Sequence, residues 1–235
     1  MIRRDKGFTL VELMVAMALT GITMVAVYKT FSAQEKVYSV QDDSASLRQD
    51  LRVAIELMSK DLRWAGYTAE LGPKKEDSIA RVVTADASTF TFTANLNTDD
   101  VVPDVTDDGE QVTYFLTGGS APYRLTRAVL VGGLPQYQPV ADNIDALNFV
   151  YVLSDGTTTS FPVDLTKIRS IQVTVVARAN RADKEYVNRT CYWNQAGPQP
   201  APPAVPDCSL SLLGAPPNDG FRRRVLTATI RCPNL

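Results

Sequence analysis

The residue with the clearest chemical potential in this 235-residue chain is Glu12, because it lies inside an apolar segment. Residues 8–28 read FTLVELMVAMALTGITMVAVY and contain no other charged side chain and no proline. At about 1.5 Å per helical residue, a segment of this length spans roughly 30 Å, the thickness of a hydrocarbon core. A carboxylate in such a segment is costly without a partner, so Glu12 is a candidate functional residue.

A partner for Glu12 would be created by a cut after Gly7. Phe8 would then carry a free amine one helical turn from the carboxylate, close enough for the two charges to neutralise each other or those of a neighbour. The preceding residues include Arg3, Arg4 and Lys6. Positive charge before an apolar span predicts that the N-terminus is cytoplasmic and that the rest of the chain crosses the membrane.

The remaining chemistry-bearing residue types give little support to an enzyme. The chain has no histidine, which removes the commonest general base and metal ligand and every Ser-His-Asp or Cys-His arrangement. The sequence therefore predicts no catalytic residue, no metal site and no cofactor.

The three cysteines lie in the last fifth of the chain and have no CxxC spacing. In an oxidising periplasm, one pair would form a disulfide and one thiol would remain. Cys191 and Cys208 bracket a proline-rich segment, and a bridge between them would close a loop of about 18 residues. The alternative bridge, Cys208–Cys232, would instead join that segment to the end of the chain, and both pairings remain open at this point.

An acidic stretch at 97–110 resembles the start of a calcium-binding loop. Asp104–Gly109 has the spacing of an EF-hand, but its twelfth position is Phe115, where a bidentate glutamate is required. We favour a solvated acidic loop, with calcium binding by another geometry left open.

Two further groups have a functional and a structural interpretation. Arg222–Arg224 could contact anionic partners, including DNA, although arginines entering an exposed strand more often keep a sheet edge soluble. Tyr192 and Trp193 could form a recognition tip, because aromatic residues are enriched at binding hot spots. They could equally pin the proline-rich segment onto a sheet.

The elements that must position these residues begin with one long helix. After Ser32 the chain turns polar, but apolar residues recur at spacings of three and four, as in an amphipathic helix with one buried face. They are Leu47, Leu51, Ala54, Met58, Leu62 and Ala65. No proline occurs before Pro73, and Gly66 stands where a left-handed C-terminal cap is expected. The pattern predicts a single helix over roughly residues 8–66.

After Pro73 the pattern changes to short β segments. Residues 88–93 alternate strictly and predict a half-buried strand. Further strands are expected at Gln111–Leu116, Tyr123–Val131, Ala146–Leu153, Ile168–Ala177 and Arg223–Ile230, separated by glycine-containing turns. Strands without intervening helices indicate an antiparallel sheet, so the predicted class is α+β, with the long N-terminal helix packed on the sheet.

The expected organisation follows from these elements. It comprises a leader at 1–7, a transmembrane and assembly helix at 8–31, its amphipathic continuation at 32–66, and a β-rich globular domain at 67–235 with a proline-rich insertion at 194–218.

The sequence GFTLVE after a short basic leader resembles the class III signal of type IV pilins and type II secretion pseudopilins. An ordinary secretory signal is cut after its apolar region, not before it. The resemblance implies that a prepilin peptidase cuts between Gly7 and Phe8 and methylates the new amine of Phe8. It also implies that Glu12 aligns the subunit with the amine of a neighbour already in the fibre.

Three further segments resemble minor pilins of the PilW kind. They are Ala54–Tyr67, the strand pair Val140–Tyr151 and Ile168–Ala177, and the closing Arg222–Ile230. The resemblance implies a non-enzymatic subunit that promotes pilus assembly at or near the fibre tip. The strand pair is shared with the J-type minor pseudopilin of type II secretion, which is the alternative, and an adhesive or DNA-binding tip module is compatible with either.

The implied partners are the prepilin peptidase, other minor and major pilins, the inner-membrane assembly platform, and membrane lipid before assembly. DNA or a surface ligand is conceivable but nothing in the sequence supports it. The implied location is the inner membrane, in a single pass with the globular domain in the periplasm, followed by the pilus at the cell surface.

Overall fold

The structure is a computed structural model that describes residues 9–67, 81–94, 109–192, 211–214 and 217–235. The chain divides into two compact units, Met1–Ala45 and Ser46–Leu235. The first contains the N-terminal part of the helix, and the second contains the rest of the helix and a β-sheet.

Helix α1 runs without interruption over Leu10–Trp64, which confirms the predicted single helix. It ends in the expected cap, since Gly66 has a φ of 75°. The N–H of Gly66 donates to the carbonyl of Thr93 (2.8 Å), and the N–H of Tyr67 donates to that of Trp64 (2.8 Å). The helix end is therefore tied to the sheet by its backbone.

The apolar stripe of the helix is its buried face. All six predicted positions are buried, together with Ile55. Burial begins only at Leu47, and residues 32–46 are exposed or half-buried. The amphipathic segment of 32–66 thus packs against the sheet over its C-terminal part.

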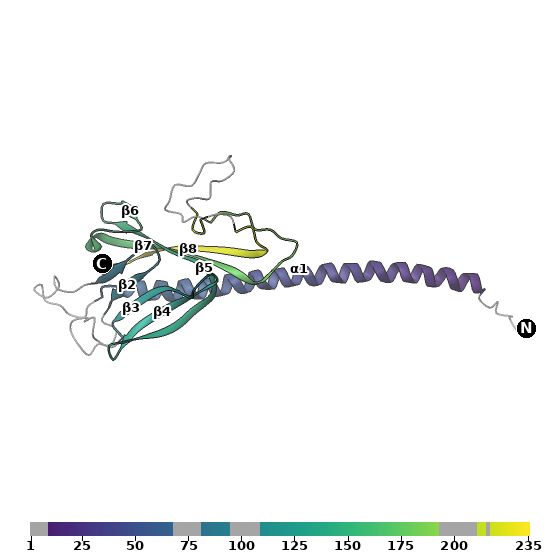
Figure 1. The fold of residues 1–235 in the computed structure, drawn as a ribbon, viewed down its shortest axis with the longest axis horizontal. Coiled ribbons are helices and arrows are strands. Elements are labelled where there is room, and N and C mark those ends of the chain that lie inside the picture. The colour runs from purple at the N-terminus through teal and green to yellow at the C-terminus, as the bar shows by residue number, and fades with distance from the viewer. Residues whose placement is uncertain (1–8, 68–80, 95–108, 193–210, 215–216) are drawn as a thin grey trace, which may run out of the picture. The chain divides into compact units, whose positions relative to one another are not determined.

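The sheet is antiparallel with the order β1-β2-β3-β4-β5-β7-β8, and β6 pairs with β5 (Figure 1). The strands are β1 (Val82–Ala85), β2 (Phe90–Thr93), β3 (Gln111–Thr117), β4 (Tyr123–Val131), β5 (Leu134–Leu153), β6 (Thr158–Thr159), β7 (Ile168–Ala182) and β8 (Phe221–Arg231). A short 3₁₀ turn, η2 (Leu165–Lys167), precedes β7. The predicted α+β class, with the helix packed on an antiparallel sheet, is confirmed.

Two strand predictions were incomplete. Strand β5 begins twelve positions before the expected Ala146, since Gly132 and Gly133 (φ 60° and 73°) form a two-residue hairpin that leads directly from β4 into it. The prolines at 135 and 139 obscured this part of the strand in the sequence. Strands β1 and β6 were not predicted, because four and two residues are too short for a periodicity to appear.

The strand expected at residues 88–93 is present as β2, but the expectation that it is half-buried was wrong. All four residues of β2 are buried. Phe90 and Phe92 point into the core, and Thr91 remains polar but shares a hydrogen bond with the hydroxyl of Thr113 (3.0 Å). A paired hydroxyl tolerates burial, so alternation of polar and apolar residues did not imply a solvent-facing side.

The central strands are covered on both faces. Leu147, Phe149 and Tyr151 of β5 lie in the same apolar cluster as the helix. On the other face, Ala146 and Val176 pack against Tyr192, which comes from the segment after β7. This second layer positions the side chains described next.

Candidate functional site: the exposed apolar helix and the polar networks of the β-domain

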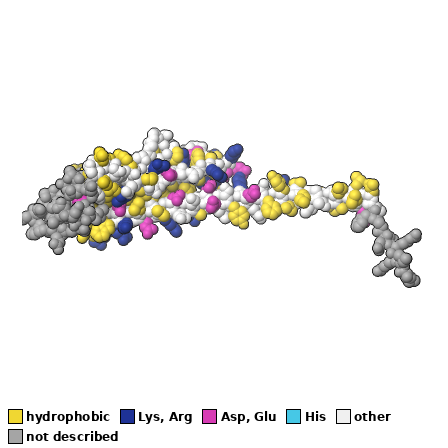
Figure 2. All heavy atoms as spheres, turned by 90° about the horizontal axis from the view of Figure 1, so that it is seen from below, with side chains coloured by type: hydrophobic (Ala, Val, Ile, Leu, Met, Phe, Trp, Pro, Cys, Tyr) yellow, Lys and Arg dark blue, Asp and Glu magenta, His cyan; other side chains and the backbone are white. Residues whose placement is uncertain are grey.

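The first part of α1 exposes its apolar side chains. The large hydrophobic residues Leu10, Met14, Met17, Ile22, Met24 and Tyr28 are all more than 60% exposed. Figure 2 shows hydrophobic atoms along this segment. By length and composition, the helix is able to cross a membrane. An exposed apolar surface of this kind is stable only in lipid or against other apolar helices.

The polar hydroxyls of this segment are satisfied within the helix itself. Thr20, Thr23 and Thr30 donate to the carbonyls four residues earlier, at 2.7, 2.8 and 3.0 Å. Glu12 is the one charged side chain between Leu10 and Tyr28. Its carboxylate is therefore the one charge of this segment that needs a partner in a dry environment.

Glu12 is held at the start of the helix by Thr9. The N–H of Glu12 donates to the Thr9 hydroxyl (3.2 Å), and the N–H of Thr9 donates back to the Glu12 carboxylate (3.4 Å). The Thr9 hydroxyl also contacts that carboxylate (3.3 Å). This reciprocal pattern is a capping box, in which residues i and i+3 satisfy otherwise unpaired backbone donors.

Sequence reasoning missed Thr9, although its signal was present. The spacing Thr-x-x-Glu before an apolar run is typical of a helix start. The predicted cleavage residues Gly7 and Phe8 lie outside the described residues. A cut between them would retain Thr9, so the capping box would persist in the processed chain.

A polar clamp fixes the C-terminal part of α1 on the sheet. Asp61 accepts hydrogen bonds from the hydroxyl of Tyr114 on β3 (2.7 Å) and from Nε of Arg127 on β4 (2.6 Å). The Asp61 and Arg127 side chains are only 12% and 15% exposed. Burial, and secondly the Asp61 carboxylate, raise the pKa of Tyr114 above its ordinary value, so it stays a neutral donor.

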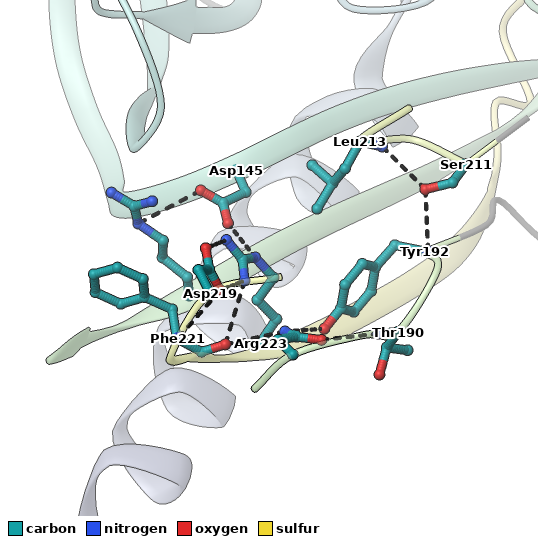
Figure 3. Close-up of polar contacts among 10 residues, drawn as sticks. Asp145, Thr190, Tyr192, Ser211, Leu213, Asp219, Phe221 and Arg223 are labelled. Atoms are coloured by element: carbon teal, nitrogen blue, oxygen red, sulfur yellow. Dashed lines mark hydrogen bonds and ion pairs between the residues drawn. The ribbon is translucent and has the colours of Figure 1, made fainter. Parts of the chain in front are cut away.

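A second polar network lies on the opposite face of the sheet (Figure 3). Arg223 of β8 donates through Nε to Asp145 of β5, and through Nη1 and Nη2 to Asp219 (2.6 and 2.7 Å). Arg178 of β7 lies 3.6 Å from Asp145. The Asp145 and Arg223 side chains are 2% and 4% exposed, so this is a buried ion network.

The network favours the charged forms of Arg223 and Asp219. Burial alone would lower the pKa of Arg223, but its hydrogen bonds with Asp219 and Asp145 raise it overall. The hydrogen bonds from Arg223 lower the pKa of Asp219 below its usual value.

Both interpretations of Arg222–Arg224, contact with anionic partners and solubility of a sheet edge, assumed three solvent-facing arginines, and the structure shows one. Arg222 pairs with Asp183 (2.9 Å) and stacks on Tyr186, with its guanidinium carbon 4.3 Å from the ring centroid. Arg223 is buried in the network above. Only Arg224 is exposed. Two of the three arginines, Arg222 and Arg223, are paired with carboxylates of the domain and do not form a surface for DNA.

Tyr192 pins a segment onto the sheet. Its ring is buried against Ala146 and Val176, and its hydroxyl accepts a hydrogen bond from the side chain of Asn188 (2.7 Å). Its N–H donates to the hydroxyl of Ser211 (3.2 Å), as Figure 3 shows. Of the two interpretations of Tyr192, the structural one is correct, while Trp193 lies outside the described residues.

The other sequence-based candidates are only partly described. Cys232 is a free, buried thiol, and burial raises its pKa to about 12. Cys208 lies outside the described residues, so the predicted Cys191–Cys208 bridge stays a prediction. The acidic stretch at 97–108 and most of the insertion at 194–218 are also outside them. Within the part of the chain that the structure describes, no group of three metal-ligating side chains occurs.

Comparison with known proteins defines the class. Residues 2–28 match the prokaryotic N-terminal methylation motif. Residues 113–234, about half of the chain, match the model of type IV pilus-assembly protein W. The protein is therefore a type IV pilin-like protein. Within that class, the chain belongs to the PilW family.

Among solved structures, the chain is similar to a type IV-like pilin from Thermus thermophilus. The two share 17% identity, the match covers 80% of this chain and 96% of that one, and the TM-score is 0.47. No curated protein matches the chain.

Proposed function

We propose that this protein is a minor type IV pilin that promotes pilus assembly at or near the fibre tip. It is inserted in the inner membrane, cut between Gly7 and Phe8 by a prepilin peptidase, and methylated on Phe8. It then moves with other pilins through the assembly platform into the fibre. Its role is structural, and no step of it requires catalysis by this chain.

The observation that carries the proposal is the exposed apolar helix with a single carboxylate near its start. The β-domain has its own core, in which the C-terminal part of α1 takes part. The apolar residues before Ala45 have no place in that core and need lipid or other helices as their surroundings. A subunit that first resides in a membrane and then joins a helical bundle meets both needs.

Glu12 supplies the register of that bundle. In a water-poor bundle, an unpaired carboxylate costs several kcal/mol, whereas one that meets the amine of a neighbouring subunit is neutralised. The capping box holds the carboxylate at the end of the helix until that amine arrives. Only one axial position of the incoming helix brings the two charges together.

Processing is tested by mass spectrometry of the N-terminal peptide of the membrane-bound protein. The expected peptide begins at a methylated Phe8 and lacks residues 1–7. An intact Met1 terminus, or a cut beyond residue 20, would contradict the proposal. A bulky side chain in place of Gly7 is expected to block the cut.

Assembly is tested with Glu12→Gln, which removes the charge but leaves a side chain that can still complete the capping box. We expect unchanged membrane levels and a loss of about tenfold or more in the sheared-fibre fraction, since 1.4 kcal/mol of lost pairing is tenfold. Glu35→Gln, an equal change of charge farther along the exposed helix, is the matched control and is expected to assemble normally. Equal amounts of both variants in fibres would show that Glu12 does not guide docking.

The fraction in which the protein is recovered also distinguishes a minor type IV pilin from the alternative, a J-type minor pseudopilin. Recovery with a secretion pseudopilus, and not with sheared pili, would replace the pilus assignment while leaving the pilin class intact.

A further inference from the structure

Among the described residues, free edges of the sheet run along β1, the first part of β5 and β8, and they differ in how they are protected. Strand β1 forms one end of the sheet and is only four residues long. The first part of β5, residues 134–143, pairs with β4 but not with β7, whose pairing begins at Ile144. Strand β8 forms the other end of the sheet over eleven residues.

The free edge of β5 is blocked by prolines. Val131 and Leu134 flank a two-residue hairpin and form a hydrogen-bonded pair. Hydrogen-bonded and non-hydrogen-bonded pairs alternate along an antiparallel ladder, so residues 135, 137 and 139 of β5 turn their backbone N–H and C=O groups away from β4. Pro135 and Pro139 occupy two of these three outward positions. A proline there removes an outward donor without breaking the ladder, which is how natural sheets prevent pairing with another chain.

Strand β8 has no such protection. The N–H of Cys232 donates to the carbonyl of Arg169 (3.0 Å), so these two residues form a hydrogen-bonded pair. Because such pairs alternate along the ladder, the even-numbered residues of β8 are the ones whose backbone is hydrogen-bonded to β7. The close hydroxyl contact between Thr174 and Thr227 (3.1 Å) is typical of the non-hydrogen-bonded pairs between them. Val225, Thr227 and Thr229 therefore turn their N–H and C=O groups outward, and these groups make no backbone hydrogen bond with any other described residue.

The charge of this edge is of one sign. Residues 220–235 contain four arginines and no acidic residue. Arg222 and Arg223 are neutralised by Asp183, Asp145 and Asp219. Arg224 and Arg231 are exposed and make no ion pair in the described part of the chain. Two copies of β8 would bring these cations together, so the charge disfavours pairing of the chain with itself.

We propose that β8 is a docking edge that accepts an extended, acid-bearing strand from a different pilin subunit. The added strand would form backbone hydrogen bonds with Val225, Thr227 and Thr229, and its carboxylates would meet Arg224 and Arg231. This inference rests on the proposed function, because it requires a fibre made of several subunit types. According to this inference, the β-domain selects which subunit lies next to it in the fibre, and it does so independently of the docking of the helix.

The test is photocrosslinking in cells of the full-length chain. The probe p-benzoylphenylalanine replaces either Val225, on the open edge, or Tyr137, on the proline-blocked edge; both positions are exposed. We expect the probe at 225 to crosslink to another subunit that carries a processed pilin N-terminus, within a segment containing Asp or Glu. The probe at 137 should not form this crosslink.

Two sets of variants then address the mechanism. With the probe at 225, Thr229→Pro removes one outward N–H and should abolish the crosslink, whereas Thr229→Val keeps that N–H and should preserve it. Resistance of the buried Cys232 thiol to alkylation shows that both variants are folded. If the proline variant fails this control, Arg231→Gln, a surface change, should weaken crosslinking by about two- to fivefold.

Each other outcome overturns the inference. These outcomes are a crosslink to a second copy of this chain, equal crosslinking from 137, or a crosslink that survives Thr229→Pro. If the chain enters fibres but the probe at 225 finds no subunit, the edge proposal fails and the proposed function stands. If the chain never enters fibres, the proposed function fails by itself.

Discussion

Glu12 combines two features, a capping interaction at the start of the helix and an isolated charge in an apolar segment. Its carboxylate completes a capping box with Thr9 and is also the only charge of an apolar helix segment. The two roles are compatible because a carboxylate has two oxygens and about four acceptor positions. They are also separable, because capping requires an acceptor whereas pairing with an amine requires a charge.

Thr9→Ala is predicted to weaken the helix start without removing the charge of Glu12. Loss of an N-cap hydroxyl costs about 1 kcal/mol, which corresponds to roughly fivefold. We expect faster hydrogen exchange at the first amides of the helix and a fall in fibre incorporation smaller than that of Glu12→Gln. Mass spectrometry must first show that the N-terminus is processed normally. A larger loss for Thr9→Ala than for Glu12→Gln would mean that the cap, not the charge, governs assembly.

The ion pair between Asp145 and Arg223 contrasts with Glu12, because its two charges are buried and pair with each other inside the β-domain. Asp145→Leu would leave the buried Arg223 guanidinium with only Asp219 and is predicted to cost about 3–5 kcal/mol. Thermal unfolding of the detergent-solubilised chain measures this. The double variant Asp145→Leu/Arg223→Leu should recover much of the loss, because no buried charge then remains unpaired. Arg124→Leu, which breaks an exposed pair with Asp142, is the matched control and should change stability by less than about 1 kcal/mol.

At the scale of elements, the junction between α1 and the sheet depends on Gly66. A Cβ at this position would lie 2.7 Å from the carbonyl oxygen of Asn234, and its φ of 75° is unfavourable for other residues. The helix end, the last residue of β2 and the C-terminal residues therefore meet where only a glycine fits.

Gly66→Ala is predicted to destabilise the domain by about 1–3 kcal/mol. The reason is that both the backbone conformation and the approach of Asn234 are incompatible with a side chain. Gly119→Ala, in the turn between β3 and β4, is the control, because a Cβ there meets no atom within 4 Å. Thermal unfolding of the two variants should differ clearly, and equal melting temperatures would show that the C-terminus can move away from the helix end.

At the scale of the whole molecule, we predict that the reactivity of the three cysteines shows which disulfide closes the proline-rich insertion at 194–218. Cys232 is buried and has a raised pKa, so it should resist alkylation in the folded chain and react on unfolding. Cys191 and Cys208 would then be left to form the disulfide that closes the proline-rich insertion. In the chain-entropy model, such a loop contributes roughly 3 kcal/mol.

Non-reducing peptide mapping is expected to recover Cys191 linked to Cys208, with one alkylatable thiol at Cys232 after denaturation. Three free thiols, or a crosslinked peptide that contains Cys232, would contradict this pairing. The latter result would favour the alternative Cys208–Cys232 bridge.

Sequence alone determined the features that depend on neighbours a few residues apart. The helix from Leu10 to Trp64, its buried stripe and its glycine cap follow from spacings of three and four, and most strands follow from alternation and turn residues. The isolation of Glu12 and the N-terminal methylation motif were also readable at this level, because both lie in one contiguous stretch of sequence.

Only the tertiary structure decided which charges are available to partners. Asp61 meets Arg127 across 66 positions, and Asp145 meets Arg223 across 78, so no local pattern could pair them. The same holds for the sheet edges, since whether a strand lies at an end depends on the order in which strands associate. Arg222 and Arg223 therefore looked like a basic surface in the sequence, although the fold gives both of them internal carboxylates. A charge takes its role from what lies beside it in space, and that is set by the packing of distant segments.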